Sequence, residues 1–228
     1  MAPERVKAIL LDIGKFPYAL SSLPSVLDEK WDDAEFQQYR DAFPDRVRGD
    51  RDAFEGLVRE LTERDVKVAY LKSLQGYLWR TGYESGSLHA PIFPDVPPEL
   101  IRWHALGLNT SIYSSGSVNA QKLLFQHTDY AEQPDLQPLL KGYYDTVNAG
   151  PKTEKGSYEK IAEAERVPVG MWLFLGDNVK EVAAAIEAGM KAMVVVRPGN
   201  APLTAEEEEE YETIQSFEQI ALHSTNIP

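Results

Sequence analysis

The chain has 228 residues, of which 43% are hydrophobic, so it is long enough for one domain or for a core domain with a modest second one. Asp and Glu number 36 against 23 Lys and Arg, and the resulting net charge of −13 excludes nucleic acid and anionic membranes as expected partners. No cysteine is present, which excludes disulfides and thiolate metal sites. A small anionic substrate would therefore need a locally positive pocket.

The four histidines lie far apart in the sequence and show no metal-ligand spacing, which favours ordinary surface or core roles for them. No apolar stretch is long enough to span a bilayer, and the N-terminus has no signal-peptide pattern. We expect a soluble monomer of the cytoplasm, with the nucleus as the alternative compartment.

The first predicted element is a buried strand over residues 6–11, a short apolar run that ends at Asp12. Residues 31–83 then change to helical spacing. Two apolar stripes lie in this block, formed by Phe54, Leu57, Val58 and Leu61 and by Val68, Leu71, Leu74 and Leu78. A proline-rich segment over residues 91–98 marks a boundary. The pattern therefore predicts a helical insertion without strands after the first strand.

Strands and helices alternate after this boundary. The expected strands cover residues 110–113, 171–175 and 193–196. The expected helices cover residues 98–106, 118–125, 157–166 and 179–186, and the acidic run at 206–210 begins another. Strands that are separated by single helices predict βαβ units and one parallel sheet, to which the first strand also belongs.

Polar side chains follow the predicted strands at the points where ligands bind in an open parallel sheet. Asp12 follows the first strand, Ser114 and Ser115 follow the second, and Asp177 follows the strand that ends at Leu175. Lys152 stands in a Gly-Pro-Lys segment before a helix. Two carboxylates, two hydroxyls and one ammonium are therefore expected at one edge of the sheet.

This combination suits phosphoryl transfer. A carboxylate nucleophile needs a metal ion to screen its charge from the phosphate and a second carboxylate to hold that ion, and Mg²⁺ prefers oxygen ligands. Hydroxyls and the backbone N–H groups near Gly116, at the start of the next helix, suit phosphate oxygens. The lysine supplies the remaining positive charge.

Each of these residues also has an ordinary alternative role. Asp12 could close a turn or cap a helix, and Asp177 could cap the helix after it. The serines at 114, 115 and 117 could likewise cap the next helix. Lys152 taken alone is typical of a solvated surface lysine. The order of the residues and their shared place at strand ends favour the joint interpretation.

In this order, the residues resemble the four motifs of haloacid-dehalogenase-type hydrolases. The surrounding sequence is more similar still to the enolase-phosphatases, or acireductone synthases, of methionine salvage. The matching segments are 8–13, 16–19, 74–79, 112–117, 120–125 and 194–200, and they are spread over nearly the whole chain. The resemblance implies a Rossmann-like α/β core with a parallel sheet over residues 1–15 and 92–228, and an all-helical cap inserted over 16–91.

The resemblance also implies a phosphorylated diketone as the substrate and Mg²⁺ as the cofactor. By the match of motifs, Asp12 would be catalytic, and Asp12 and Asp177 would hold Mg²⁺ with the backbone carbonyl of Gly14. Ser114, Ser115 and Lys152 would bind the substrate phosphate.

The first motif departs from the family pattern. The family continues Asp-Ile-Glu-Gly-Thr and a flap segment before Phe-Pro-Tyr-Ala, whereas here Asp12-Ile13 is followed by Gly14-Lys15 and then by Phe16. The missing acid protonates the leaving oxygen and then activates water, a role worth about a hundred- to ten-thousandfold in rate. A shortened transcript or gene model explains this better than a selected loss. The departure predicts slow turnover.

Two further segments are weaker candidates for contact with the substrate. The Arg197–Asn200 segment is typical of a structural turn but follows a strand and could approach the site. In the helical insertion, Lys72, Gln75 and Trp79 could face the substrate, although Trp79 is equally compatible with a core position.

Two other functions compete with that of a phosphohydrolase. The first is a catalytically inactive module that keeps affinity for Mg²⁺ and phosphate. The second is a receiver-like signalling domain phosphorylated on Asp12, which the large helical insertion after the first strand disfavours.

Overall fold

A computed structural model describes residues 6–13, 22–64, 66, 68–86 and 88–222 of the chain. The chain divides into two compact units, one of residues 1–14 and 90–228 and the other of residues 15–89. None of the described helices is both long enough and apolar enough to cross a membrane.

The larger unit is built on a six-stranded sheet with the strand order β3-β2-β1-β4-β5-β6, in which every neighbouring pair is parallel. The strands are β1 (Ala8–Leu11), β2 (Asn109–Tyr113), β3 (Gly142–Tyr144), β4 (Trp172–Gly176), β5 (Lys191–Val195) and β6 (Thr213–Ile214). The parallel sheet that the alternating pattern predicts is therefore confirmed. The edge strands β3 and β6 were not predicted, because each is too short to form an apolar run.

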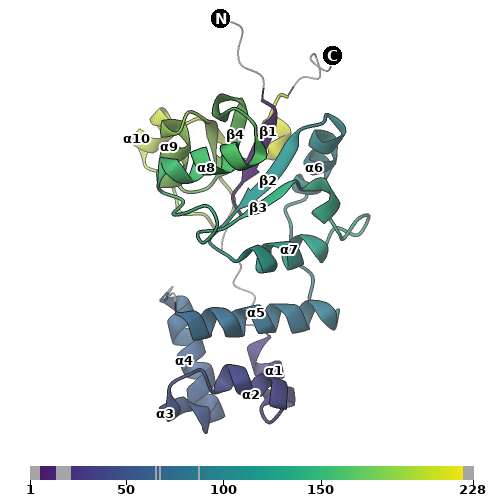
Figure 1. Ribbon diagram of the computed structural model, residues 1–228, viewed down its shortest axis with the longest axis vertical. Coiled ribbons are helices and arrows are strands. Elements are labelled where there is room, and N and C mark those ends of the chain that lie inside the picture. Colours follow the sequence, from purple (N-terminus) through teal and green to yellow (C-terminus); the bar gives the residue numbers. More distant parts are fainter. Residues whose placement is uncertain (1–5, 14–21, 65, 67, 87, 223–228) are drawn as a thin grey trace, which may run out of the picture. The chain divides into compact units, whose positions relative to one another are not determined.

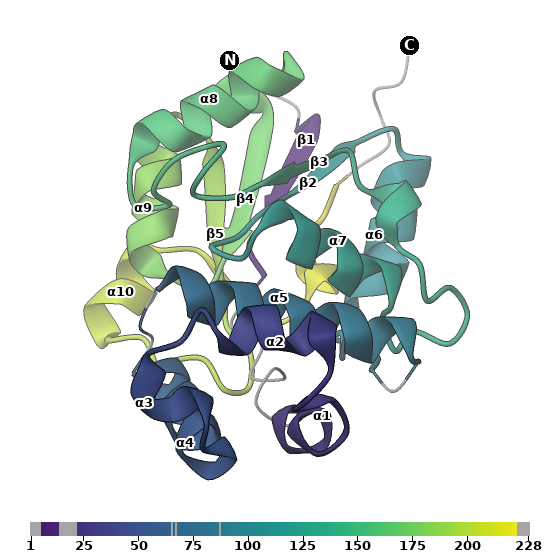
Figure 2. The same ribbon diagram turned by 60° about the horizontal axis from the view of Figure 1, so that its bottom comes forward.

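Helices cover both faces of this sheet. They are α6 (Val96–Ala105), α7 (Val118–Gln126), α8 (Lys155–Glu165), α9 (Val179–Glu187) and the short α10 (Ala205–Glu210). In Figures 1 and 2, α8 and α9 lie together on one face, and α6 and α7 lie on the other. This arrangement follows from right-handed crossovers, because the chain runs from β1 through β2 to β3 in one direction and then returns across the sheet to β4 and β5. Gly107 and Gly189, which closely follow α6 and α9, adopt φ values of +72° and +98°, a conformation that favours glycine at the end of a helix.

The core beneath α8 and α9 consists of side chains that the strands and helices present to each other. Leu10, Trp172 and Phe174 come from the sheet, and Tyr158 and Val182 come from the helices, and all five are buried. The central strands β1 and β4 are apolar and buried along their whole length, as is typical of a parallel sheet covered on both sides.

The smaller unit consists of helices in the part that the structure describes, residues 22–64, 66, 68–86, 88 and 89. They are α1 (Leu23–Lys30), α2 (Ala34–Arg40), α3 (Asp45–Arg48), α4 (Arg51–Glu63) and α5 (Ala69–Glu84). The two predicted stripes supply its core: Phe54 and Val58 are buried on α4, and Leu71, Leu74 and Leu78 are buried on α5. Within those described residues no strand occurs, as the helical spacing predicts.

Candidate active site

The strand register brings the predicted strand-end residues to one edge of the sheet. β1 lies between β2 and β4, and Leu11 pairs with Ile112 on one side and with Leu175 on the other. The backbone N–H of Asp12 donates to the Leu175 carbonyl at 2.8 Å. Ser114 and Asp177 therefore each stand one position beyond the level of Asp12, on strands about 4.8 Å away.

Lys152 lies in the middle of a buried ionic cluster. Its Nζ is 2.5 Å from Asp12 Oδ1 and 2.5 Å from Glu181 Oε2. The side chains of Lys152, Asp12 and Glu181 are 9%, 7% and 13% exposed. The alternative of a solvated surface lysine is therefore wrong for Lys152.

The charges of this cluster do not balance. Burial raises the pKa of Asp12 to about 7 against the opposing effect of Lys152, and the nearby charges of Glu181 and Asp177 raise it further. The Lys152 ammonium contacts two carboxylates, those of Asp12 and Glu181, and the charge of a third, Asp177, acts on Asp12. A divalent cation would neutralise the excess negative charge, so the cluster fits a metal ion on electrostatic grounds.

The donor atoms of the cluster also fit Mg²⁺. Asp12 uses Oδ1 for Lys152, and Asp177 uses Oδ2 to accept a hydrogen bond from Asn200 Nδ2 at 2.8 Å, so among the described residues each carboxylate keeps its other oxygen. Across the described ranges no group of three or more His, Asp or Glu side chains is arranged as a metal site. Two carboxylates completed by water or carbonyl oxygens are a usual Mg²⁺ environment. The predicted third ligand, the Gly14 carbonyl, lies outside the described residues.

The three serines after β2 differ in their hydrogen bonds and in their exposure. Ser117 caps α7, because its Oγ accepts from the Ala120 N–H at 3.3 Å, so the capping alternative is correct for this residue. Ser114 is buried and its Oγ accepts from the Gly116 N–H at 3.2 Å, which leaves its own O–H to donate elsewhere. Ser115 is exposed and therefore open to a ligand.

Two backbone N–H groups that were expected to receive phosphate already have acceptors. The Gly116 N–H bonds to Ser114 Oγ, and the Val118 N–H at the start of α7 bonds to Asp145 Oδ2 at 3.1 Å. Asp145 is buried and its other oxygen accepts the N–H groups of Val147 and Asn148 at 2.9 Å. Hydroxyls and Lys152, rather than these two N–H groups, are therefore the described groups best suited to a phosphate.

Asp177 is oriented from the loop that follows β5. The N-cap of α9 is Asn178, whose side chain accepts from the Lys180 N–H, so the expected capping alternative for Asp177 is wrong. Instead, Asn200 reaches Asp177 across this edge. The Arg197–Asn200 segment thus forms the expected turn, closed by the Arg197 N–H and Asn200 Oδ1 at 2.6 Å, and also contributes to the site.

The turn that carries Asn200 is anchored through Arg197. The guanidinium donates to Asp95 Oδ2 at 2.6 Å and lies over the rings of Phe93 and Phe217, 4.6 and 5.2 Å from their centres. The same Asp95 oxygen accepts from the Phe217 N–H at 2.7 Å. These contacts fix the loop whose far end holds Asp177.

Sequence reasoning missed Glu181 and Asp145, and it included Asn200 only as part of a segment that could approach the site. Glu181 lies in the first turn of α9, where an acidic residue is already favoured by the helix dipole, so its type carried no separate signal. The carboxylate of Asp145 directly follows β3 and would have been noticed had that three-residue strand been predicted.

The three residues of the smaller unit that were expected to face a substrate differ in their surroundings. Trp79 packs against the hydrophobic cluster of that unit, as the core alternative predicts. Gln75 Nε2 lies 3.5 Å from Thr62 Oγ1, and Lys72 is exposed. Their contact with a substrate stays a prediction.

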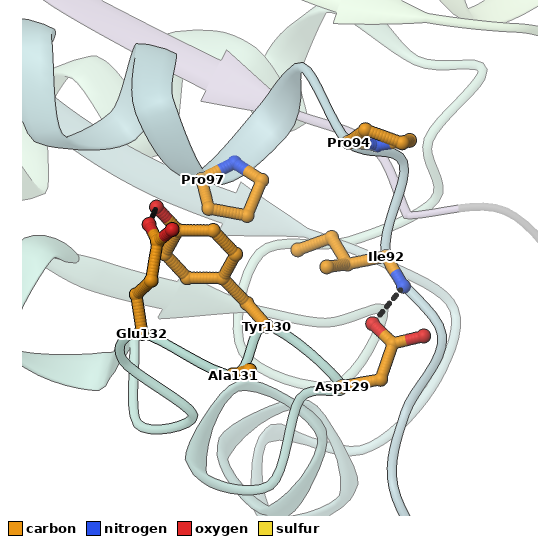
Figure 3. Close-up of a pocket in the computed structure, with 7 residues that line it drawn as sticks. All are labelled: Ile92, Pro94, Pro97, Asp129, Tyr130, Ala131 and Glu132. Atoms are coloured by element: carbon orange, nitrogen blue, oxygen red, sulfur yellow. Dashed lines mark hydrogen bonds between the residues drawn. The ribbon is translucent and has the colours of Figure 1, made fainter.

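A separate hollow in the larger unit contains none of the predicted site residues. Figure 3 shows the Tyr130 hydroxyl directed to Glu132, and the Ile92 N–H donating to Asp129 at 3.0 Å. The hollow is lined by Ile92, Pro94, Pro97, Asp129, Tyr130, Ala131 and Glu132. Two carboxylates in a lining without Lys or Arg would repel a phosphate, so the strand edge is the better candidate.

The parallel sheet, the helical insertion after β1 and the strand-end carboxylates define the class of haloacid-dehalogenase-type hydrolases. The UTR4 protein of Saccharomyces cerevisiae has this fold with a TM-score of 0.76 and 32% identity, covering 95% of this chain and all of that one. CbbY from Rhodobacter sphaeroides, solved with phosphate, matches with a TM-score of 0.60 and 16% identity over 94% of this chain and 96% of its own. No protein-family model matches the chain.

The chain belongs to the enolase-phosphatase E1 family. It is 53% identical to the Neurospora crassa Enolase-phosphatase E1 over 234 positions, which cover 96% of this chain and 99% of the relative. The Podospora anserina Enolase-phosphatase E1 is 54% identical over 207 positions, covering 90% of this chain and 88% of the relative. The chain is therefore a phosphatase of the haloacid-dehalogenase type.

The alignment with the Neurospora crassa relative also contains positions that this chain does not fill. Its 234 positions exceed the 228 residues of the chain, of which only 96% are aligned. The relative therefore carries residues without a counterpart in this chain.

Proposed function

We propose that Asp12 is the nucleophile of a methionine-salvage phosphatase that acts on a phosphorylated diketone, with Ser114, Ser115 and Lys152 binding the substrate phosphate. The observation that carries this proposal is the buried contact of Lys152 with both Asp12 and Glu181. An ammonium beside the attacking carboxylate attracts the phosphate and holds that carboxylate in place. The Asp12 oxygen bonds to phosphorus as the bond to the substrate oxygen breaks, and water then releases phosphate from Asp12.

The proposal includes Mg²⁺, held by Asp12 and Asp177 and by the carbonyl of Gly14. The bound ion would offset the charge of the phosphate beside these carboxylates. A haloacid-dehalogenase enzyme of Bacteroides thetaiotaomicron, similar in fold with a TM-score of 0.50 and 13% identity, was solved with magnesium and inorganic phosphate, which supports Mg²⁺ as the cofactor. CbbY, solved with xylulose-1,5-bisphosphate as well as with phosphate, supports a small phosphorylated ligand.

We also propose that this form turns over slowly. Its sequence places Gly14 where the family has the acid that protonates the leaving oxygen. If the absence of this acid abolished turnover completely, the chain would be the catalytically inactive module that still binds Mg²⁺ and phosphate. Residues 1–15 and 92–228 would form the core and 16–91 the cap of a cytoplasmic monomer.

Release of inorganic phosphate from a phosphorylated diketone, with and without Mg²⁺, tests the function. We expect slow release that depends on Mg²⁺ and exceeds the release from an aryl phosphate. Release at the uncatalysed rate together with intact phosphate binding would favour the inactive module instead.

Asp177→Ala should weaken Mg²⁺ binding, because it removes one of the two carboxylates that face the ion. We expect an affinity at least tenfold lower by calorimetry, since losing one charged ligand commonly costs more than about 1.4 kcal/mol. Asp135→Ala, which removes an acid from an exposed turn, is the matched control and should bind Mg²⁺ as the unchanged chain does. Equal affinities for Asp177→Ala and the unchanged chain would refute this metal site.

A further inference from the structure

Three consecutive backbone carbonyls around Lys152 each accept a hydrogen bond from a side-chain hydroxyl. Tyr113 Oη donates to the Gly150 carbonyl at 2.7 Å, Ser157 Oγ to the Pro151 carbonyl at 2.8 Å, and Tyr158 Oη to the Lys152 carbonyl at 2.7 Å. We call residues 150–152 the lysine loop. Its conformation is therefore set by side chains as well as by the backbone.

The three donors are fixed parts of the core. Tyr113 and Tyr158 are fully buried and Ser157 is 3% exposed. The two tyrosine rings meet edge to face at 5.5 Å, and Tyr158 meets Phe174 in the same way at 5.2 Å. Burial raises the pKa of Tyr113 to about 12 and that of Tyr158 still further, so both hydroxyls keep their protons near neutral pH.

The backbone alone holds the lysine loop weakly. Pro151 has no N–H, and the backbone bond to the loop among the described residues is that from the Glu154 N–H to the Pro151 carbonyl, at 3.2 Å. Gly150 has a φ of +120°, and a Cβ there would lie 2.6 Å from Ser157 Oγ. Only glycine lets the Ser157 hydroxyl come so close to the loop.

We propose that Tyr113, Ser157 and Tyr158 are positioning residues that hold the Lys152 ammonium between Asp12 and Glu181 by fixing the lysine loop. Lysine has a long side chain with many rotamers, so its ammonium stays at one point only if its backbone is also held. Tyr113 is the last residue of β2, directly before Ser114, and Ser157 and Tyr158 lie in the first turn of α8. The Tyr113 hydroxyl thus links the lysine loop to the strand that Ser114 and Ser115 follow, and the other two link it to α8. The part of this inference that concerns phosphate rests on the proposed function.

Reactivity of the Lys152 amine tests the positioning without any substrate. The chain and its Tyr113→Phe, Tyr158→Phe and Ser157→Ala variants are treated briefly with acetic anhydride, and acetylation of each lysine is followed by mass spectrometry. Lys152 should be labelled about fivefold faster in each variant, the factor to which one ordinary hydrogen bond corresponds. The exposed Lys155 and Lys160 serve as internal references.

The matched control is Tyr144→Phe. It removes a tyrosine hydroxyl from the same sheet, one that donates to Glu165 at 3.2 Å, and should leave Lys152 labelling unchanged. Labelling of Lys152 within twofold of the unchanged chain in both Tyr113→Phe and Tyr158→Phe would overturn the proposal, as would an equal rise in Tyr144→Phe. If one variant does not fold, the other two carry the same comparison.

Affinity for inorganic phosphate, measured by calorimetry with Mg²⁺ present, links the positioning to the reaction. We expect Tyr113→Phe and Tyr158→Phe to bind phosphate about fivefold more weakly and Tyr144→Phe to bind it normally. An unchanged chain that binds no phosphate would count against the proposed function alone, because the labelling result does not depend on phosphate.

Discussion

Inserting Glu-Gly-Thr and the family's flap segment between Ile13 and Phe16 should raise turnover about a hundred- to ten-thousandfold. The inserted acid stands two residues after Asp12, where it can protonate the leaving oxygen and then activate the water that releases phosphate from Asp12. Without this acid, the free-energy barrier of the reaction should be higher by roughly 3–5 kcal/mol, which corresponds to that factor in rate. The basic Lys15 of the present sequence cannot act as that acid and base beside a bound cation.

The measurement compares phosphate release by the chain as given, by the chain with the insertion, and by the insertion with Gln in place of its Glu. The Gln version restores the length of the segment without the acid, so it separates chemistry from loop length. We expect it to remain near the slow rate of the unchanged chain. Equal rates for all three would show that the missing segment has no catalytic role.

Lys152→Met should destabilise the larger unit by about 3–5 kcal/mol at neutral pH, because it leaves two buried carboxylates without their cation. The loss should shrink as the pH falls. The ammonium lowers the pKa of Asp12, so removal of the ammonium raises that pKa further. When the pKa of a buried acid is higher in the folded than in the unfolded chain, ionisation of the acid destabilises the folded chain, and this cost disappears at low pH, where the acid is protonated in both states. Phosphate affinity should be lost together with stability.

Urea unfolding of Lys152→Met at pH 5 and pH 8 measures this effect, with Lys155→Met as the control. Lys155 forms an ion pair with Glu187 in which the side chains are 52% and 67% exposed, so its loss should change stability by less than about 1 kcal/mol at either pH. A Lys152→Met chain that is as stable as the Lys155→Met chain at pH 8 would show that the buried cluster does not form.

The sheet and the residues at its edge could be predicted from the sequence because of one physical pattern. Buried parallel strands are apolar on both faces, so β1, β4 and most of β5 are short apolar runs, and polar residues follow the ends of the strands. The edge strands β3 and β6 carry no such run, and Asp145 was missed with β3.

The contacts that organise the site could not be predicted, because they join residues whose types fit their local roles equally well. Glu181 suits any first helical turn, Asn200 suits a turn, and Tyr158 suits any core. Ser117 shows the same ambiguity, because it stands close to the candidate phosphate ligands Ser114 and Ser115 in the sequence but caps a helix in the structure. Only the folded chain shows which of these side chains contact Asp177 or the lysine loop.

The identity of the nucleophile is tested most directly by trapping phosphate on the chain. The protein is incubated with a phosphorylated diketone and Mg²⁺, quenched with acid within seconds and digested for mass spectrometry. We expect one phosphoryl group on the peptide that contains Asp12, accumulating because its release lacks the family's acid, and no such group in Asp12→Asn. Phosphate release that proceeds without a phosphorylated Asp12 and is unchanged in Asp12→Asn would contradict the account.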